Sequence, residues 1–194
     1  MNKQMIAAAL AAASVIAAPV HATTVALPAD GSWSEFTVDN SVAPSYGNGW
    51  IDDADGSPLS FIFTIAAGRI GTLTVVDAGF AGDTFAITNF GTLIGHTSSV
   101  ATGTIDGSLE FDFDAALANP AYSHGVYTLS AGTYSISGWL LQSVLDDRGA
   151  ALGATDGGLR LSVSEVPEPA DAALLLGGLA ALALVARRRS NPSI

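Results

Sequence analysis

Short runs of alternating apolar and polar residues, separated by turns rich in Gly, Asp and Ser, dominate the middle of this chain. Successive side chains of a β-strand point to opposite faces, so strict alternation predicts strands with one buried face. Many short strands of this kind predict an all-β fold, an antiparallel β-sandwich with a jelly-roll-like strand order. The predicted strands are Phe36–Val38, Ser60–Ile65, Ile70–Val76, Phe85–Phe90, Leu109–Asp114, Thr133–Leu140 and Leu159–Val163.

Three of these segments carry more specific predictions. Ser60–Ile65 is apolar on both faces, which predicts a central strand buried on both sides. The alternation from residue 109 to 114 predicts Leu109, Phe111 and Phe113 on the core, with carboxylates on the other face. In Thr133–Leu140 the same rule puts Trp139 opposite the core residues. Ala115–Ala118 is the expected helical turn, ended by Asn119-Pro120.

The N-terminus has the organisation of a secretory signal peptide. A weakly basic start, Met1–Gln4, is followed by the Ala-rich apolar stretch Met5–Ala18 and by the small-x-small ending Val20-His21-Ala22. We expect cleavage after Ala22, so that residues 1–22 are removed during Sec export by signal peptidase. An uncleaved amphipathic helix is the alternative, but the stretch has no polar face.

The C-terminus combines a rigid step, an apolar run and a basic stop. Val166, Pro167, Glu168 and Pro169 cannot continue a helix or an inner strand, because proline lacks the N–H group and restricts its predecessor. Ala172–Ala186 contains no polar side chain and would span roughly 22 Å as a helix, against about 30 Å of hydrocarbon. Arg187, Arg188 and Arg189 then place that end in the cytoplasm. This pattern predicts a helix in the inner membrane, with a buried core helix as the alternative.

This tripartite tail resembles the PEP-CTERM sorting signal of exported Gram-negative bacterial proteins. The resemblance implies that an exosortase-type membrane enzyme recognises Val166–Pro169, in bacteria that make exopolysaccharide. It also implies export across the inner membrane, at least transient anchoring there, and a final place in the cell envelope or outside the cell. The domains are then a signal peptide (1–22), an extracytoplasmic β-sandwich (23–165) and a sorting tail (166–194).

A second resemblance covers most of Trp50–Leu140. The segments Leu73–Phe85 and Ser123–Tyr134 are similar to a domain of secreted bacterial proteins with the pattern "TVxDAFxxGDxF" followed by "SHGxxxLxAGxHxI". This chain departs from the pattern at Tyr134, where a histidine is common. The resemblance implies a fold and no particular reaction.

The body is strongly acidic and contains no cysteine. Its cations are Arg69, Arg148 and Arg160, against sixteen Asp and Glu between residues 23 and 165. Such a surface repels nucleic acid and is compatible with divalent cations, although acidity for solubility explains it equally well. Without cysteine, stability depends on the core or on bound ions, and thiol chemistry is excluded.

Asp52, Asp53 and Asp55 form the sharpest candidate metal site. They lie in a Gly-terminated loop, and calcium takes six to eight oxygen ligands of the kind that such loops supply. The EF-hand order and its terminal Glu are absent, so the alternatives are a different calcium site or a solvated Asp-Gly turn. Asp77 and Asp83 bracket a second turn, where they are either further ligands or turn formers.

Tyr46 and Trp50, next to this loop, are candidate stacking platforms for sugar rings. Trp33 and Trp139 are further candidates, and core packing is the alternative for every tryptophan. An aromatic platform beside a cation would make a calcium-dependent carbohydrate-binding site.

Catalytic groups are harder to find. Glu110, Asp112 and Asp114 are spaced about 7 Å apart along the predicted strand, reminiscent of glycoside hydrolysis but typical of a solvated face. Neither His96 nor His124 lies in a metal-binding motif, the nucleophile elbow is absent, and we expect His124 to anchor a loop. The sequence therefore predicts a non-catalytic cell-surface or extracellular-matrix protein. A calcium-dependent carbohydrate-binding module is the first alternative and a polysaccharide hydrolase the last.

Overall fold

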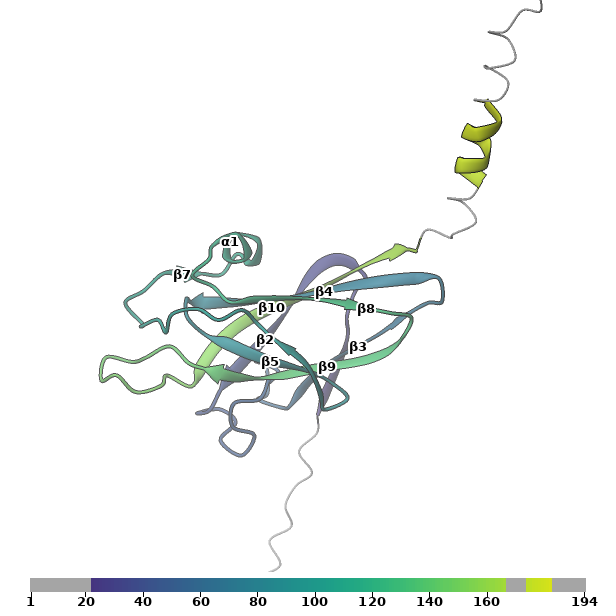
Figure 1. Ribbon diagram of the computed structural model, residues 1–194. Helices are drawn as coiled ribbons and strands as arrows, with labels where there is room; N and C mark the ends of the chain where they lie inside the picture. Colours follow the sequence, from purple (N-terminus) through teal and green to yellow (C-terminus); the bar gives the residue numbers. More distant parts are fainter. Residues whose placement is uncertain (1–21, 167–173, 183–194) are drawn as a thin grey trace, which may run out of the picture.

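Two β-sheets face each other in a sandwich (Figure 1). The computed structural model describes residues 22–166 and 174–182. The strand order of the first sheet is β1 (Thr23–Ala26), β3 (Leu59–Ile65), β9 (Gly132–Gln142), β5 (Thr84–Asn89) and β6 (Thr92–His96). The second sheet contains β2 (Asp30–Asp39), β10 (Ala154–Glu165) and β4 (Arg69–Phe80), and β4 also pairs with β7 (Leu109–Glu110) and β8 (His124–Leu129).

The pairing confirms the predicted all-β sandwich. Among the named strands, β1 and β3 run parallel and the other pairs run antiparallel. The sequence analysis did not foresee the strands β1, β6 and β8, which contribute edge positions. The jelly-roll-like strand order stays a prediction.

The main core lies between the inner faces of the two sheets. The rings of Phe36 and Trp50 stack with centroids 3.8 Å apart, and Phe85 meets Phe36 edge-on at 5.2 Å. Burial of each large apolar side chain contributes about 1.5–3 kcal/mol to the stability of the fold. These three rings, from β2, a loop and β5, connect the two sheets at the centre of the sandwich.

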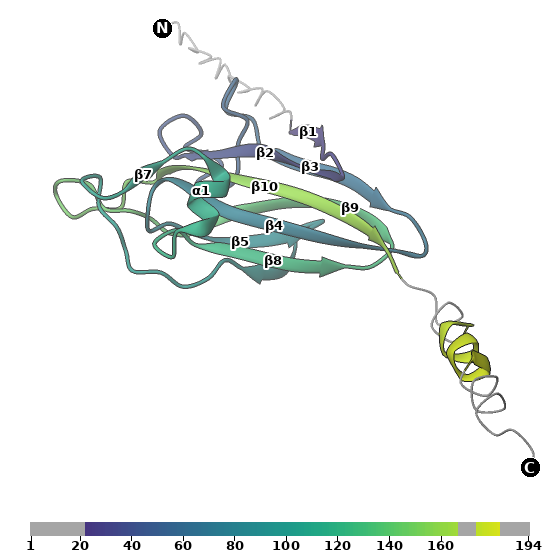
Figure 2. The same ribbon diagram turned by 90° about the horizontal axis from the view of Figure 1, so that it is seen from above.

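A smaller cluster covers the outer face of the second sheet. Helix α1 (Phe113–Ala118) lies over this sheet (Figure 2). Ala116 of the helix packs with Val76 of β4 and with Tyr122, whose hydroxyl group donates a hydrogen bond to the Gly79 carbonyl oxygen at 3.1 Å. One outer face is therefore partly covered, while α1 leaves the first sheet open.

The strand predicted from residue 109 to 114 ends at Glu110. Leu109 and Phe111, expected in the core, are 53% and 62% exposed. The prediction is wrong because the Asp112 carboxylate accepts the N–H groups of the next turn, and so begins α1 instead of continuing a strand. The helical turn itself, ended at Asn119, is confirmed.

The prediction that β3 is buried on both faces is also wrong. Ile62 is 43% exposed, because the outer face of the first sheet has no layer over it at this position. The predicted placement of Trp139 is confirmed, since it lies on the face opposite Ile136 and Leu140.

Most of both chain ends lies outside the described residues. This applies to the signal peptide up to residue 21, to Pro167–Pro169 and to Arg187–Arg189. Of the expected membrane helix, residues 174–182 are described and are helical. Within the two described ranges, no helix is both long enough and apolar enough to cross a membrane.

Candidate functional site

An open groove of about 440 Å³ lies on the outer face of the first sheet. Two aromatic side chains line it, Tyr46 at 41% exposure and Trp139 at 39%. We call it the aromatic groove. None of its other lining residues carries a charge, and all but Leu140 are small or polar: Asn48, Gly49, Thr88, Gly91, Ser137, Gly138 and Leu140.

A short segment of main chain builds one side of the aromatic groove. Beyond the first residue of β3, the carbonyl oxygen of Asn48 accepts the N–H of Leu140 at 2.8 Å, and Trp50 donates its N–H to the carbonyl oxygen of Gly138 at 3.0 Å. These bonds attach residues 48–50 to β9 as an extension of the first sheet. They bring Tyr46, from the preceding turn, to the same groove as Trp139, which points outward from β9.

Gly49 allows the Tyr46 ring to lie against the main chain. A Cβ atom at this position would lie 2.2 Å from Cε1 of Tyr46 and 2.7 Å from two further ring atoms. A larger residue would therefore displace the ring. The close contact holds the ring in one place, so less side-chain freedom is lost when a ligand binds.

Trp50 belongs to the core and not to a stacking surface, which corrects the prediction made for it. The side chain is completely buried and stacks on Phe36. Its main-chain bond to β9 turns the indole inward, so neither ring face is open to a ligand. Trp33 is also engaged, because the Arg160 guanidinium lies 4.4 Å from its ring centroid and Phe113 packs at 5.5 Å.

The Asp-rich loop forms a tight turn with Gly56 at a φ of 70°. The carboxylate of Asp52 accepts the N–H of Ala54, and that of Asp55 accepts the N–H of Ser57, each at 2.9 Å. Hydrogen bonds from the hydroxyl and N–H groups of Ser57 lower the pKa of Asp55. Within residues 22–166 and 174–182 no three acidic, His or Cys side chains are arranged to hold a metal ion, so calcium here stays a prediction.

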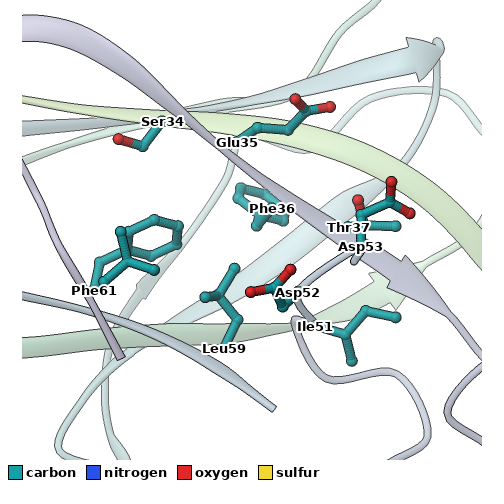
Figure 3. A pocket seen from close by; sticks show the side chains of 10 residues that line it. Ser34, Glu35, Phe36, Thr37, Ile51, Asp52, Asp53, Leu59 and Phe61 are labelled. Atoms are coloured by element: carbon teal, nitrogen blue, oxygen red, sulfur yellow. The ribbon is translucent and has the colours of Figure 1, made fainter. Parts of the chain in front are cut away.

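A second groove, of about 390 Å³, opens beside this loop where the edges of the two sheets meet (Figure 3). Phe36 and Phe61 line it together with the carboxylates of Glu35, Asp52 and Asp53. Burial, followed by the charges of Asp156 and Asp53, raises the pKa of Glu35. Tyr46 lines the aromatic groove and not this one, so the two halves of the predicted calcium and sugar site lie in separate grooves.

Asp77 and Asp83 form a buried pair at the connection between β4 and β5. Their exposed fractions are 0% and 1%. Asp77 accepts the N–H groups of Gly82 and Asp83 at 3.3 and 3.2 Å, and Asp83 accepts that of Val144 at 2.7 Å. Asp77 therefore has the turn-forming role, one of the two roles predicted for these residues, whereas the Asp83 carboxylate holds the distant main chain of Val144.

The remaining oxygen of each carboxylate has no hydrogen-bond partner within the described residues. Burial, and then the charge of Asp83, raises the pKa of Asp77 to about 9. Burial raises the pKa of Asp83 to about 6. Because no solvent reaches the pair, we assign it to the stability of the fold and not to a surface reaction.

The three carboxylates proposed for a hydrolase do not share one face. Glu110 accepts two N–H groups of its own loop, at 3.0 and 2.9 Å, and Asp112 caps α1. Asp114 forms an ion pair with Arg160 at 2.8 Å. The chain leaves the extended conformation at Asp112, so the regular spacing on which the prediction depended is lost.

Ser123 and His124 also lack the arrangement of a nucleophile and its base. Ser123 is buried and donates a hydrogen bond to Thr97 Oγ1 at 2.9 Å. The main chain of His124 bonds twice to Ser98, once to its hydroxyl oxygen at 3.0 Å and once to its N–H at 2.7 Å. The predicted loop-anchoring role of His124 is therefore confirmed for its main chain.

The fold and its surface define a two-sheet β-sandwich domain with an uncharged aromatic groove on one outer face. No protein-family model matches the chain, and no curated protein is significantly similar to it. Its structure resembles the pre-peptidase C-terminal domain of a collagenase from Bacillus anthracis, with 9% identity, coverage of 75% of this chain and 99% of the other, and a TM-score of 0.38.

It also resembles PliG, a periplasmic inhibitor of g-type lysozyme from Aeromonas hydrophila. Here the identity is 14%, the coverage is 73% of this chain and 96% of the other, and the TM-score is 0.36. Both likenesses are too distant to carry an argument about function. The two family resemblances seen in the sequence stay predictions.

Proposed function

We propose that this chain is an exported, non-catalytic protein of the bacterial cell surface or extracellular matrix, delivered by its C-terminal tail. The observation that carries the proposal is where the domain stops. The last strand, β10, ends at Glu165, and Val166 is 45% exposed. The Pro-Glu-Pro sequence follows at once, so a processing enzyme of the exosortase type would meet its motif directly after the folded domain.

Substitution of Glu168 tests this function in the native bacterium. We expect Glu168→Ala to change the mass of the mature protein or its distribution between membrane and extracellular fractions, measured by mass spectrometry and fractionation. Glu165→Ala is the matched control, because it removes a carboxylate three residues earlier that forms an exposed ion pair with Arg69. Exposed pairs contribute about 0–1 kcal/mol, so the control should fold and be sorted normally. Unchanged processing of Glu168→Ala would contradict the proposal.

Carbohydrate binding is the second candidate function, as a module that depends on calcium. The exposed ring of Tyr46 in the aromatic groove favours the carbohydrate half of this hypothesis. The calcium half depends on Asp52, Asp53 and Asp55, which lie outside that groove. Each half is therefore tested separately, the calcium half by thermal melting and the carbohydrate half by binding.

A further inference from the structure

Charge is distributed very unevenly between the two sheets. None of the five strands of the first sheet contains Asp, Glu, Lys or Arg, although the chain has a formal net charge of −11. The strands of the second sheet carry acidic residues in β2, β4, β7 and β10. An acidic protein has no need of such a neutral face for solubility.

Hydroxyl groups replace charges on the outer face of the first sheet. Strand register brings them together in cross-strand pairs: the Oγ atoms of Thr64 and Thr133 are 3.2 Å apart, and those of Thr88 and Ser137 are 3.0 Å apart. Thr88 itself is buried and also donates to the carbonyl oxygen of Ser137, so of the second pair it is Ser137 that reaches the surface. Each hydroxyl can both donate and accept a hydrogen bond. The row of hydroxyl groups on β9, at residues 133, 135 and 137, leads directly to Trp139.

The aromatic groove ends this row. Tyr46 and Trp139 present large rings with a polar edge, and such amphipathic side chains are enriched at contact surfaces. The groove volume of about 440 Å³ is within the usual range of ligand sites, roughly 300–1,000 Å³. An uncharged surface of aromatic rings and hydroxyl groups is chemically complementary to a sugar. The C–H face of a sugar ring packs on an aromatic ring, and its hydroxyl edge bonds to Ser and Thr.

We propose that the outer face of the first sheet binds an uncharged polysaccharide, with one sugar ring between Tyr46 and Trp139 and the chain continuing over the hydroxyl groups of β9. This inference rests on the carbohydrate half of the second candidate function and deepens it, because it names the ligand class and replaces Trp50 by Trp139. It does not require calcium, since no carboxylate lines the aromatic groove. An anionic polysaccharide is disfavoured because the groove offers no cation and the rest of the domain is acidic.

Affinity electrophoresis of the whole chain tests the inference, in a zwitterionic detergent without a sugar headgroup. The gels contain dextran, hydroxyethyl cellulose or mannan as neutral probes and alginate as the anionic probe. We expect retardation by at least one neutral probe, unchanged by a chelator and by added salt, because no ion pairs are involved. We expect Trp139→Ala and Tyr46→Ala each to weaken binding by roughly tenfold or more.

Phe111→Ala is the matched control, because it removes an exposed aromatic ring outside the groove. It should bind like the unmodified chain, and thermal melts establish that every variant is folded. Binding of alginate alone, or equal binding by folded Trp139→Ala, would overturn the inference while leaving carbohydrate binding possible elsewhere. Failure to bind any of the four probes would overturn both, without affecting the sorting function. A dimer that Trp139→Ala dissociates would show that a second copy covers the face, and would overturn the inference too.

Discussion

At the scale of single residues, the buried carboxyl groups of Asp77 and Asp83 make the stability of the fold depend on pH. Two negative charges in a closed site repel each other and are separated from water, so the pair favours a bound proton. None of the three arginines of the described chain is paired with them: Arg69 and Arg160 form ion pairs elsewhere, and Arg148 is exposed in a loop. The pKa of Asp77 is accordingly raised from 3.8 to about 9.

A raised pKa in the folded state means that the folded protein binds this proton more tightly than the unfolded chain does. The stabilising contribution is complete below pH 3.8 and is lost as the pH rises toward about 9. We predict that the melting temperature falls by several degrees between about pH 5 and about pH 9. Asp77→Asn keeps the shape and an acceptor oxygen but cannot ionise, so it should melt above the unmodified protein at the alkaline end.

Scanning calorimetry across this pH range measures both effects. Asp106→Asn is the control, because Asp106 is an exposed loop residue with no side-chain partner in the described structure. A melting temperature that rises with pH would contradict the prediction. That result would indicate that a metal ion, and not a proton, neutralises the pair.

At the scale of elements, the segment after β7 depends on its capping residue. The Asp112 carboxylate accepts the N–H groups of Asp114 and Ala115 at 2.9 and 3.1 Å. Removing such a cap typically costs about 1 kcal/mol, whereas Asn caps as well as Asp. We predict that Asp112→Ala lowers the free energy of unfolding by about 1 kcal/mol and that Asp112→Asn changes it by a few tenths, measured by urea denaturation. Equal stability of all three proteins would mean that α1 does not depend on this cap.

The same segment shows where sequence reasoning succeeds and fails. Alternation predicts β9 and the outward position of Trp139 correctly, because pairing with β3 and β5 keeps that strand extended. The alternation from residue 109 to 114 looks identical, but there the Asp112 carboxylate accepts N–H groups of the following turn, and the chain turns into α1 instead of pairing as a strand. Neighbouring composition cannot separate these cases, since the outcome depends on whether a partner strand is present.

The candidate site could be predicted in part for a similar reason. Tyr46 and Trp50 lie in a Gly-rich loop without periodicity, so their burial cannot be derived from the pattern of residues. The main-chain bond from Trp50 to Gly138 decides that one ring is in the core and the other outside it. The sequence shows which strands lack charged residues, but that these strands form one sheet is known only from the strand pairing.

At the scale of the whole molecule, the acidic loop could couple an ion to folding. An ion that binds the folded state raises the melting temperature in proportion to the logarithm of its concentration. We predict that calcium raises the melting temperature by several degrees relative to a chelator. Asp55→Asn should remove this shift, because an Asn side chain retains the turn but not the charge. Identical melting temperatures with calcium and with chelator would contradict this prediction and indicate that the loop is an ordinary acidic turn.

The position of β10 has a mechanical consequence. This strand pairs with β2 on one side and with β4 on the other, and its last residue, Glu165, directly precedes the predicted tail. A pull on the tail therefore acts along a strand held by two rows of hydrogen bonds, which must shear together instead of opening one by one. A tail attached to an edge strand would peel away under much less force. The proposed sorting tail would thus join the sandwich at a point that resists tension well, which suits the proposed role at a cell surface.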